Sequence, residues 1–351
     1  MNRNRREFLQ MSALCAGAAL TGCASGRSSA GALAKDGDWR AILLQLGNNM
    51  WCDWYPEDVD VSALKKGLPD RRLRCRDDIW RQATDHAAEK GLNMVVVDVA
   101  EGLVYPSHPD LAVAGSWSAE KLSGEVARLR AKGLEVVPKL NFSTLHNGWL
   151  KQYRRQITTS GYYRLCEDLL RDVHEVFDAP RYIHLGGNDE FRMHPHPFQY
   201  FVAREGHLYK HDFLHLVNEV EGLGARPWAW CDYGWTHPDF WTWCPKSVLL
   251  SNRLGDARRD GFELDDQALA AFKSVKIGDD KRIPAFKRIG EAGFDQVPCA
   301  TEDMNGLVRL GRTAAAPSRL KGFMVAPWVP CDSEANLAAI RRSADQLSAV
   351  L

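Results

Sequence analysis

Three polar residues stand together in the stretch RYIHLGGNDEF: Asn188, Asp189 and Glu190. They follow an apolar run, Tyr182–Gly186, that has the character of a buried strand. Adjacent carboxylates repel each other, and burial makes their charges costly. The arrangement suits acid–base chemistry, because a carboxylate that stays ionised raises the pKa of its neighbour and keeps it protonated near neutral pH. The spacing alone does not decide which carboxylate donates a proton and which stays charged.

A repeated unit of the chain must position these residues. In this unit an amphipathic helix ends at glycine, and an apolar strand follows. Glycine just past a helix supplies the left-handed cap, and it does so at Gly91, Gly133, Gly224, Gly293 and Gly322. The strands are apolar throughout, which indicates a parallel sheet buried on both faces. The predicted strands are Ile42–Leu46, Met94–Asp98, Glu135–Leu140, Tyr182–Gly186, Pro227–Cys231, Val248–Ser251, Gln296–Cys299 and Phe323–Ala326.

Strands that alternate with helices in this way predict an α/β fold, a (β/α)8 barrel with a parallel sheet. An open doubly wound sheet is the alternative, but QLGNNMW after the first strand lacks the GxGxxG spacing of a dinucleotide site. In a barrel, functional residues lie at the C-terminal ends of the strands. The residues predicted there are Asp98, Asn141, His146, Asn188, Asp189, Glu190, Trp230, Asp232, Trp235 and Trp328.

Two stretches resemble glycoside hydrolase family 20, the β-N-acetylhexosaminidases. HLGGNDE resembles the family's His-x-Gly-Gly-Asp-Glu motif after strand four, and VVPKLNFSTLH, which ends at His146, is similar to its strand three. The resemblance implies hydrolysis of a glycan, with N-acetylhexosamine as the implied sugar. In that chemistry the substrate's 2-acetamido oxygen attacks the anomeric carbon, an Asp orients the acetamide, and a Glu donates the proton. We expect no cofactor and no resident metal.

The sequence departs from the family motif, because Asn188 stands where the motif has Asp. If Asn188 is a one-residue insertion, Asp189 and Glu190 take the family's Asp and Glu roles. An ungapped match instead gives those roles to Asn188 and Asp189. We take the insertion as the working alignment, and under it His146 and Asp232 are expected to contact sugar hydroxyls.

Aromatic residues predict how a sugar could be held. Trp230 and Trp328, at the ends of strands five and eight, are expected to line the pocket, as barrel Trp residues of the family do. DYGWTHPDFWTWCP contains Trp235, Trp241 and Trp243, which form either a stacking platform for a pyranose or a hydrophobic plug over the barrel. The main alternative function is therefore a non-catalytic barrel that captures glycans with its Trp residues.

Other chemistries find less support. His184, His194, His196 and Asp189 are possible metal ligands, but their spacing matches no metal motif, and His184 is interpreted as a residue of the barrel core. The sequence contains neither the GxSxG of a serine nucleophile nor a P-loop.

The N-terminal segment predicts export. NRREFLQ, with Arg5 and Arg6, resembles a twin-arginine signal, and LTGC, which ends at Cys23, resembles the lipobox of bacterial lipoproteins. The resemblance implies acylation of Cys23 and a lipoprotein anchored to the membrane, periplasmic or on the outer surface. An ordinary signal peptide is the alternative. The predicted organisation is 1–22 signal peptide, 23–38 flexible tether and 39–351 catalytic barrel.

Charge and cysteine usage limit the partners. Lys+Arg and Asp+Glu both count 45, so no basic field is available for nucleic acid. Seven of the nine cysteines follow Cys23, without CxxC spacing, and most are expected to be small core residues rather than bridges. We expect a carbohydrate substrate and a lipid anchor, and no obligate protein partner.

Overall fold

The computed structural model describes residues 38–53, 68–187, 202–254, 279–301, 303–314 and 317–351. All of them belong to one compact unit, Gly31–Leu351. Asn188, Asp189, Glu190 and Cys23 lie outside the described residues, and so do His194 and His196.

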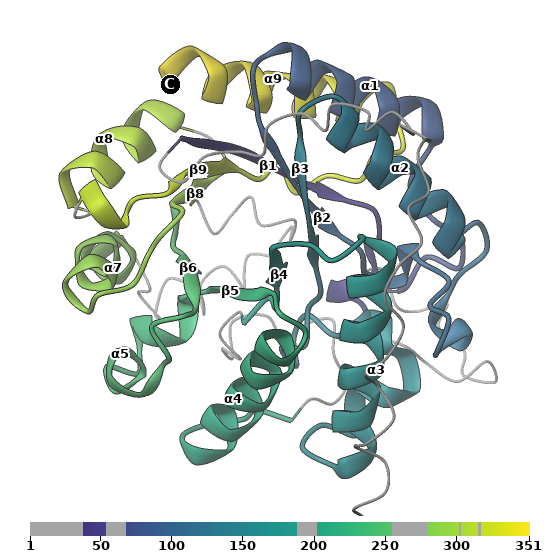
Figure 1. Ribbon diagram of the computed structural model, residues 1–351, viewed down its shortest axis with the longest axis horizontal. Coiled ribbons are helices and arrows are strands. Elements are labelled where there is room, and N and C mark those ends of the chain that lie inside the picture. The colour runs from purple at the N-terminus through teal and green to yellow at the C-terminus, as the bar shows by residue number, and fades with distance from the viewer. Residues whose placement is uncertain (1–37, 54–67, 188–201, 255–278, 302, 315–316) are drawn as a thin grey trace, which may run out of the picture. The chain divides into compact units, whose positions relative to one another are not determined.

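The strands form one parallel sheet that closes into a barrel, which confirms the predicted (β/α)8 fold (Figure 1). Their order in the sheet is β6-β5-β4-β3-β2-β1-β9-β8-β7. The bounds are β1 Trp39–Gln45, β2 Met94–Asp98, β3 Glu135–Lys139, β4 Tyr182–His184, β5 Arg226–Trp230, β6 Leu249–Ser251, β7 Arg253–Leu254, β8 Cys299–Ala300 and β9 Gly322–Val325.

The sixth predicted strand is bent rather than straight. β6 pairs with β5, and β7 pairs with β8, with Asn252 as the only residue between them. The N–H of Cys299 donates to the carbonyl of Asn252 at 2.8 Å. Consecutive segments of one bent strand therefore bind both neighbours and close the barrel, so nine assigned strands fill eight places.

The helices surround the ring of strands (Figure 1). Hydroxyl caps begin several of them: the Ser118 side chain accepts from Lys121 N, and Thr159 accepts from Tyr162 N, both at 3.2 Å. The bounds are α1 Asp77–Glu89, α2 Ala119–Ala131, α3 Ser160–Val176, α4 His207–Gly222, α5 Phe240–Trp243, α7 Asp279–Glu291, α8 Met304–Ala314 and α9 Glu334–Val350.

Four of the five predicted cap glycines have the left-handed conformation, with φ from 76° to 85°: Gly91, Gly133, Gly224 and Gly293. The prediction is wrong for Gly322, whose φ is 144°. That glycine begins β9, and a Cβ there would lie 2.2 Å from the carbonyl oxygen of Trp39. It is required by the close approach of β9 to β1 rather than by a helix end.

The strands are apolar throughout because both faces of the sheet are buried. Along β1, Ala41 and Leu43 belong to the cluster inside the barrel, whereas Ile42 and Leu44 belong to the cluster under the helices. Successive side chains of a strand point to opposite faces, so each strand supplies both cores.

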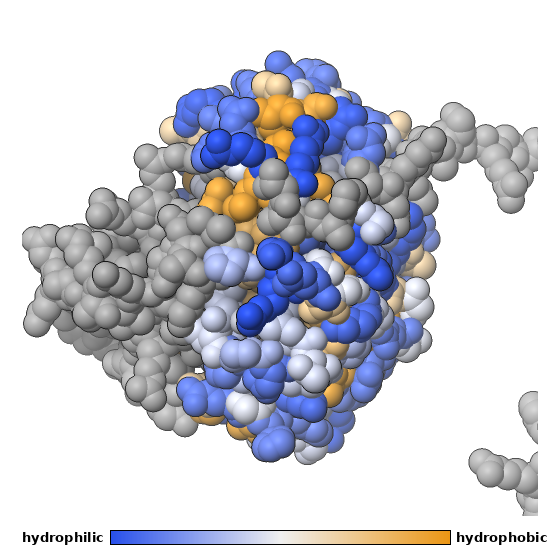
Figure 2. Space-filling model, turned by 90° about the vertical axis from the view of Figure 1, so that its left-hand side faces the viewer, coloured by the Kyte–Doolittle hydropathy of each residue, from blue (hydrophilic) through white to orange (hydrophobic). Residues whose placement is uncertain are grey.

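The described residues on one face of the protein are largely hydrophilic. Figure 2 shows this on the face that carries α7 and α8, where one group of apolar residues lies among hydrophilic ones. The large hydrophobic residues that are exposed among those described are Leu68, Leu208 and Leu351. No helix in the described part of the chain is long and apolar enough to cross a membrane.

We predict that Gly186→Ala is more destabilising than Gly224→Ala. Both glycines have left-handed φ, 73° and 80°, which costs about 1–2 kcal/mol for a residue with a Cβ. A Cβ at Gly186 would also lie 2.7 Å from Asn141 Oδ1, whereas at Gly224 it would meet nothing within 4 Å. Overpacking adds roughly 1–3 kcal/mol at Gly186 alone. Urea unfolding measures both variants, and equal losses would contradict the packing argument.

Candidate active site at the barrel mouth

One row of polar residues lies inside the barrel near the C-terminal ends of four neighbouring strands. In register across β1, β2, β3 and β4 stand Gln45, Asp98, Lys139 and His184. Lys139 Nζ donates to Asp98 Oδ2 at 2.5 Å and to Asn141 Oδ1 at 2.7 Å. Asn141 Nδ2 donates to Asp98 Oδ1 at 2.9 Å. Each of these five side chains is at most 1% exposed, so the row is a buried polar layer.

Burial opposes both charges of the central pair. It raises the pKa of Asp98 and lowers the pKa of Lys139, and their mutual attraction counteracts both shifts. The two predicted sugar ligands of this layer, Asp98 and Asn141, thus bond to Lys139 and to each other. Whether they also contact a sugar stays a prediction.

His184 is held neutral. Its Nδ1 accepts the N–H of Gly186 at 3.0 Å, so the ring proton of the neutral form lies on Nε2. Burial, assisted by the charge of Lys139, holds the pKa of His184 well below its usual range. Nε2 has no hydrogen-bond partner among the described residues, and the same is true of Trp230 Nε1 and of the Gln45 amide. Unpaired buried polar atoms of this kind are where an ordered water or a ligand group gains most.

A series of aromatic rings leads from this layer toward the ends of the strands. The His184 ring lies 5.0 Å from Trp230, and Trp230 lies 5.9 Å from Trp328. Trp51 continues the series, with its centroid 6.4 Å from Trp328 and 6.4 Å from His146. The structure therefore brings together three predicted site residues, Trp230, Trp328 and His146, through Trp51. We call this series, from His184 to His146, the aromatic series.

The backbone of Trp328 is strained. Its φ is 52°, a conformation that bulky residues rarely adopt. Its ring lies against Trp230 at the end of β5 and against Trp51 in the segment after β1. Strain retained at the end of a barrel strand is typical of a functional position.

A third group lies at the ends of β5 and β6. Asp232 Oδ2 accepts a hydrogen bond from Arg253 Nε at 3.0 Å, and Arg253 Nη2 forms an ion pair with the same oxygen at 2.8 Å. The Arg253 guanidinium lies 5.7 Å from the centre of the Trp235 ring, and Trp235 Nε1 donates to Asn252 Oδ1 at 3.0 Å. Arg253 is close enough to Lys139 to lower its pKa, which links this group to the buried layer. Asp232 is buried and Trp235 half-buried.

Two of the three Trp residues in the aromatic stretch after β5 pack as a hydrophobic plug. Trp241 is 7% exposed and packs edge-on against Phe240 and Phe294. Trp243 packs on Phe240 in the cluster under the helices. Trp241 is therefore part of a hydrophobic plug, and the half-buried Trp243 packs against it.

Sequence reasoning left Glu101 out of the predicted site. This carboxylate is 2% exposed and accepts the N–H of Asn48 at 2.7 Å and that of Asn49 at 3.0 Å. Burial raises the pKa of Glu101 to about 7, although these backbone hydrogen bonds lower it. Glu101 holds the segment after β1 that carries Trp51, and so positions the aromatic series.

The chain leaves β4 at the centre of this arrangement. The carbonyl of Gly186 accepts the N–H of Trp230 at 2.7 Å, and the carbonyl of Gly187 accepts the Tyr209 hydroxyl at 3.3 Å. Both glycines have left-handed φ, 73° and 75°. Asn188 follows Gly187 directly in the sequence.

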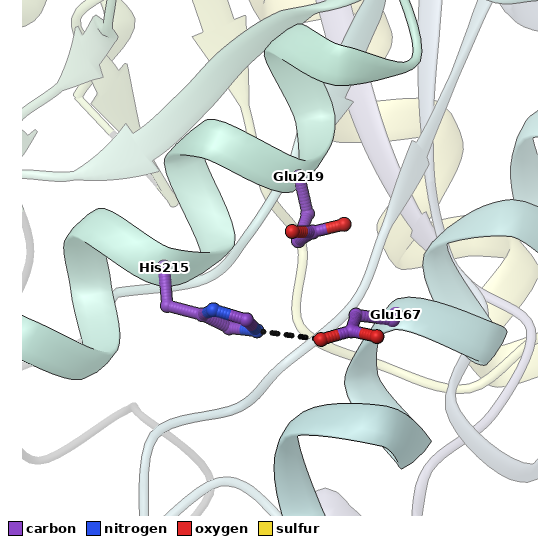
Figure 3. A group of neighbouring side chains, drawn as sticks. All are labelled: Glu167, His215 and Glu219. Atoms are coloured by element: carbon purple, nitrogen blue, oxygen red, sulfur yellow. Dashed lines mark ion pairs between the residues drawn. The ribbon is translucent and has the colours of Figure 1, made fainter. Parts of the chain in front are cut away.

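A separate group of possible metal ligands lies outside the barrel. Glu167 on α3 and His215 and Glu219 on α4 have ligand atoms within 4.8 Å of one another (Figure 3). His215 Nε2 is 3.3 Å from Glu167 Oε1, an ion-pair distance without the geometry of a hydrogen bond. All three are partly exposed, and such groups commonly pair without a metal. They take no part in the mouth.

Comparison with solved structures identifies what the barrel is similar to. A β-N-acetylhexosaminidase from Bacteroides fragilis matches 89% of this chain over 65% of its own, with a TM-score of 0.56 and 12% identity. A GH20 exo-β-N-acetylglucosaminidase from Vibrio harveyi, in complex with N-acetylglucosamine, matches 88% of this chain over 54% of its own, with a TM-score of 0.55 and 12% identity. Dispersin B matches 79% of this chain over 94% of its own, with a TM-score of 0.50 and 14% identity.

The chain shares their fold. It spans less than two thirds of the Bacteroides and Vibrio enzymes, which are longer proteins. No protein-family model matches the sequence, and no curated protein matches it.

We predict that Lys139→Met destabilises the protein by about 3–5 kcal/mol, because it leaves Asp98 as an uncompensated buried charge. The double variant Lys139→Met/Asp98→Leu removes both charges and should recover most of the loss. Denaturant unfolding of the three proteins measures this. A double variant no more stable than the single one would show that the pair is not the source of the effect.

Proposed function

We propose that this protein is a glycoside hydrolase that acts on a glycan at an N-acetylhexosamine residue, with acid–base catalysis after β4. The proposal is carried by one observation. β4 ends beside β5, Trp230 N–H and the Tyr209 hydroxyl bind the carbonyls of Gly186 and Gly187, and the sequence that follows is Asn188, Asp189 and Glu190. The shared fold with GH20 enzymes supports it.

The two predicted carboxylates have distinct proposed roles. Glu190 is the general acid that protonates the leaving oxygen and then activates water. Asp189 stays ionised, orients the 2-acetamido group and stabilises the positive charge that develops on it. Its charge keeps the pKa of Glu190 high enough for proton donation.

The described residues offer surfaces on which a sugar can be held. The half-buried rings of Trp328 and Trp51 have apolar faces on which a pyranose can stack, and the buried Trp230 supports Trp328 from within the barrel. We propose that His146 and Asp232 contact sugar hydroxyls and that Trp235 adds a further apolar edge. Asp98 and Asn141, which are bonded to Lys139, are proposed to support the sugar from below.

The position of Asn188 decides between the two alignments. As an inserted residue, Asn188 is a substrate-binding neighbour of the catalytic pair. Under the ungapped match it would orient the acetamide itself, and Asp189 would be the acid. An amide can hydrogen-bond the acetamide but cannot stabilise developing charge as a carboxylate does.

Glu190→Gln is expected to lower turnover of an alkyl β-N-acetylglucosaminide by about 10²–10⁴, the usual contribution of a general acid. An aryl glycoside with an acidic leaving group should lose much less, because its departure needs no proton. Asp189→Asn should impair both substrates, because attack by the acetamide precedes departure of either leaving group. Rates of sugar release from the two substrates measure the difference.

Glu175→Gln, at an exposed position of α3, is the matched control and should leave both rates unchanged. A harmless Glu190→Gln, together with an Asp189→Asn that abolishes only the alkyl glycoside reaction, would establish the ungapped alignment. Glycan binding without any sugar release from the wild-type protein would establish the non-catalytic binding barrel instead.

We also propose that the protein is exported as a lipoprotein through its twin-arginine signal and Cys23 lipobox. Cys23→Ser should move it from the membrane to the soluble fraction, because acyl chains provide the anchor. Cys15→Ser, in the same leader segment, is the control and should stay with the membrane. Fractionation followed by immunoblotting measures both, and unchanged membrane association of Cys23→Ser would refute the anchor.

A further inference from the structure

Two cysteines far apart in the sequence meet beside the barrel mouth. Cys75 precedes α1, and Cys331 lies between β9 and α9. The residues on both sides of Cys75 bind the same short segment. Arg74 donates to Asp332 Oδ2 at 2.9 Å, and the N–H of Arg76 donates to the carbonyl of Cys331 at 2.8 Å.

These bonds bring the two cysteines within the range of a disulfide. With standard backbone dimensions, the Arg76–Cys331 hydrogen bond keeps the Cα atoms of Cys75 and Cys331 within about 7.5 Å. The pKa of the Cys75 thiol is raised mainly by hydrogen bonding with Cys331, which makes the two side chains neighbours. Disulfides span Cα separations of roughly 4.4–6.8 Å, so the upper bound lies within about an ångström of that range. Cys52, Cys166 and Cys244, in contrast, have no thiol among the groups that affect their pKa.

We propose that Cys75 and Cys331 form a disulfide once the protein reaches an oxidising compartment. The oxidant is a thiol–disulfide oxidoreductase or a small-molecule disulfide such as oxidised glutathione. The two thiols lose two protons and two electrons to form the S–S bond, and the oxidant's disulfide is reduced to two thiols. Export in a folded state suits this order, because the thiols are already in place when they meet the oxidant.

The reaction should be slow at neutral pH and faster at higher pH. The hydrogen bond to Cys331, assisted by burial, raises the pKa of the Cys75 thiol well above its usual range. The thiolate is the nucleophile in disulfide exchange, so a raised pKa reduces the reactive fraction. An oxidoreductase that delivers a mixed disulfide would overcome this limit.

The bond would join the first and last parts of the barrel. β1 and β9 are neighbours in the sheet, and Cys75 and Cys331 belong to the segments that follow them. Trp51 and Trp328 belong to the same two segments and contact each other at 6.4 Å. The disulfide would therefore tie together the two segments that carry Trp51 and Trp328. It does not depend on the proposed hydrolase activity.

The test uses the purified full-length protein, incubated with oxidised glutathione, denatured, alkylated without reductant and digested. The expected result is one cross-linked peptide pair containing Cys75 and Cys331, lost on reduction. Because the bond closes a very long loop, the oxidised form should melt about 3–8 °C above the reduced form. The oxidation rate should rise with pH between 7 and 9.

Two variants serve as controls for this test. Cys75→Ser should abolish the cross-link and the melting difference, whereas Cys52→Ser, at another half-buried cysteine, should retain both. Alkylation of both Cys75 and Cys331 after oxidation would overturn the proposal, as would glutathione attached to either one in place of the cross-link. These results are read by mass, so they are separate from any failure of glycoside hydrolysis.

Discussion

Lys139 and Asp98 form an ion pair inside the barrel, on adjacent strands, where neither side chain meets solvent. Two buried charges are tolerable only when they neutralise each other and their remaining polar atoms are bonded, and Asn141 supplies those bonds on both sides. The exit of β4 depends on this arrangement of Lys139, Asp98 and Asn141. Gly186 has space only because it has no Cβ beside Asn141, so the ion pair, the amide and the exit of β4 form one packed unit.

His184 is the neutral member of that unit, beside the charged Lys139 and Asp98. His184 stays uncharged because burial and the nearby Lys139 cation both disfavour a second positive charge. The surroundings of the His184 ring are thus set by the ion pair and by the ring of Trp230. The neutral imidazole and the indole rings give this part of the barrel interior an uncharged lining next to the ion pair.

Much of the barrel could be predicted from the sequence, because continuous apolar strands and glycine-ended helices are local signals that tertiary structure reinforces. Asn252 shows the limit: no local signal marks the residue at which the sixth strand bends to bind both neighbours. Lys139 was recoverable, since it alternates with Val137 and Asn141 along an inward-facing strand. For Glu101 only the position after the second strand could be predicted, because its role is to bind backbone N–H groups far away in the sequence. The packing of Trp241 and Trp243 likewise depends on helices whose approach the sequence does not specify.

The bent strand also makes the barrel wall uneven. β1 and β2 are paired from Ala41–Met94 through Gln45–Asp98, whereas β7 meets β8 at Arg253–Cys299 and Leu254–Ala300. Local opening of a folded protein begins where few backbone bonds must break together. The N-terminal half of this barrel therefore provides a stiff support for Lys139 and Asp98. On the other side of the sheet, Leu250 and Asn252 add backbone hydrogen bonds to Val297 and Cys299 beside the β7–β8 pair. The buried ion pair is therefore mounted on the longest described pairing of the barrel, so the geometry of the polar layer is inherited from β1, β2 and β3.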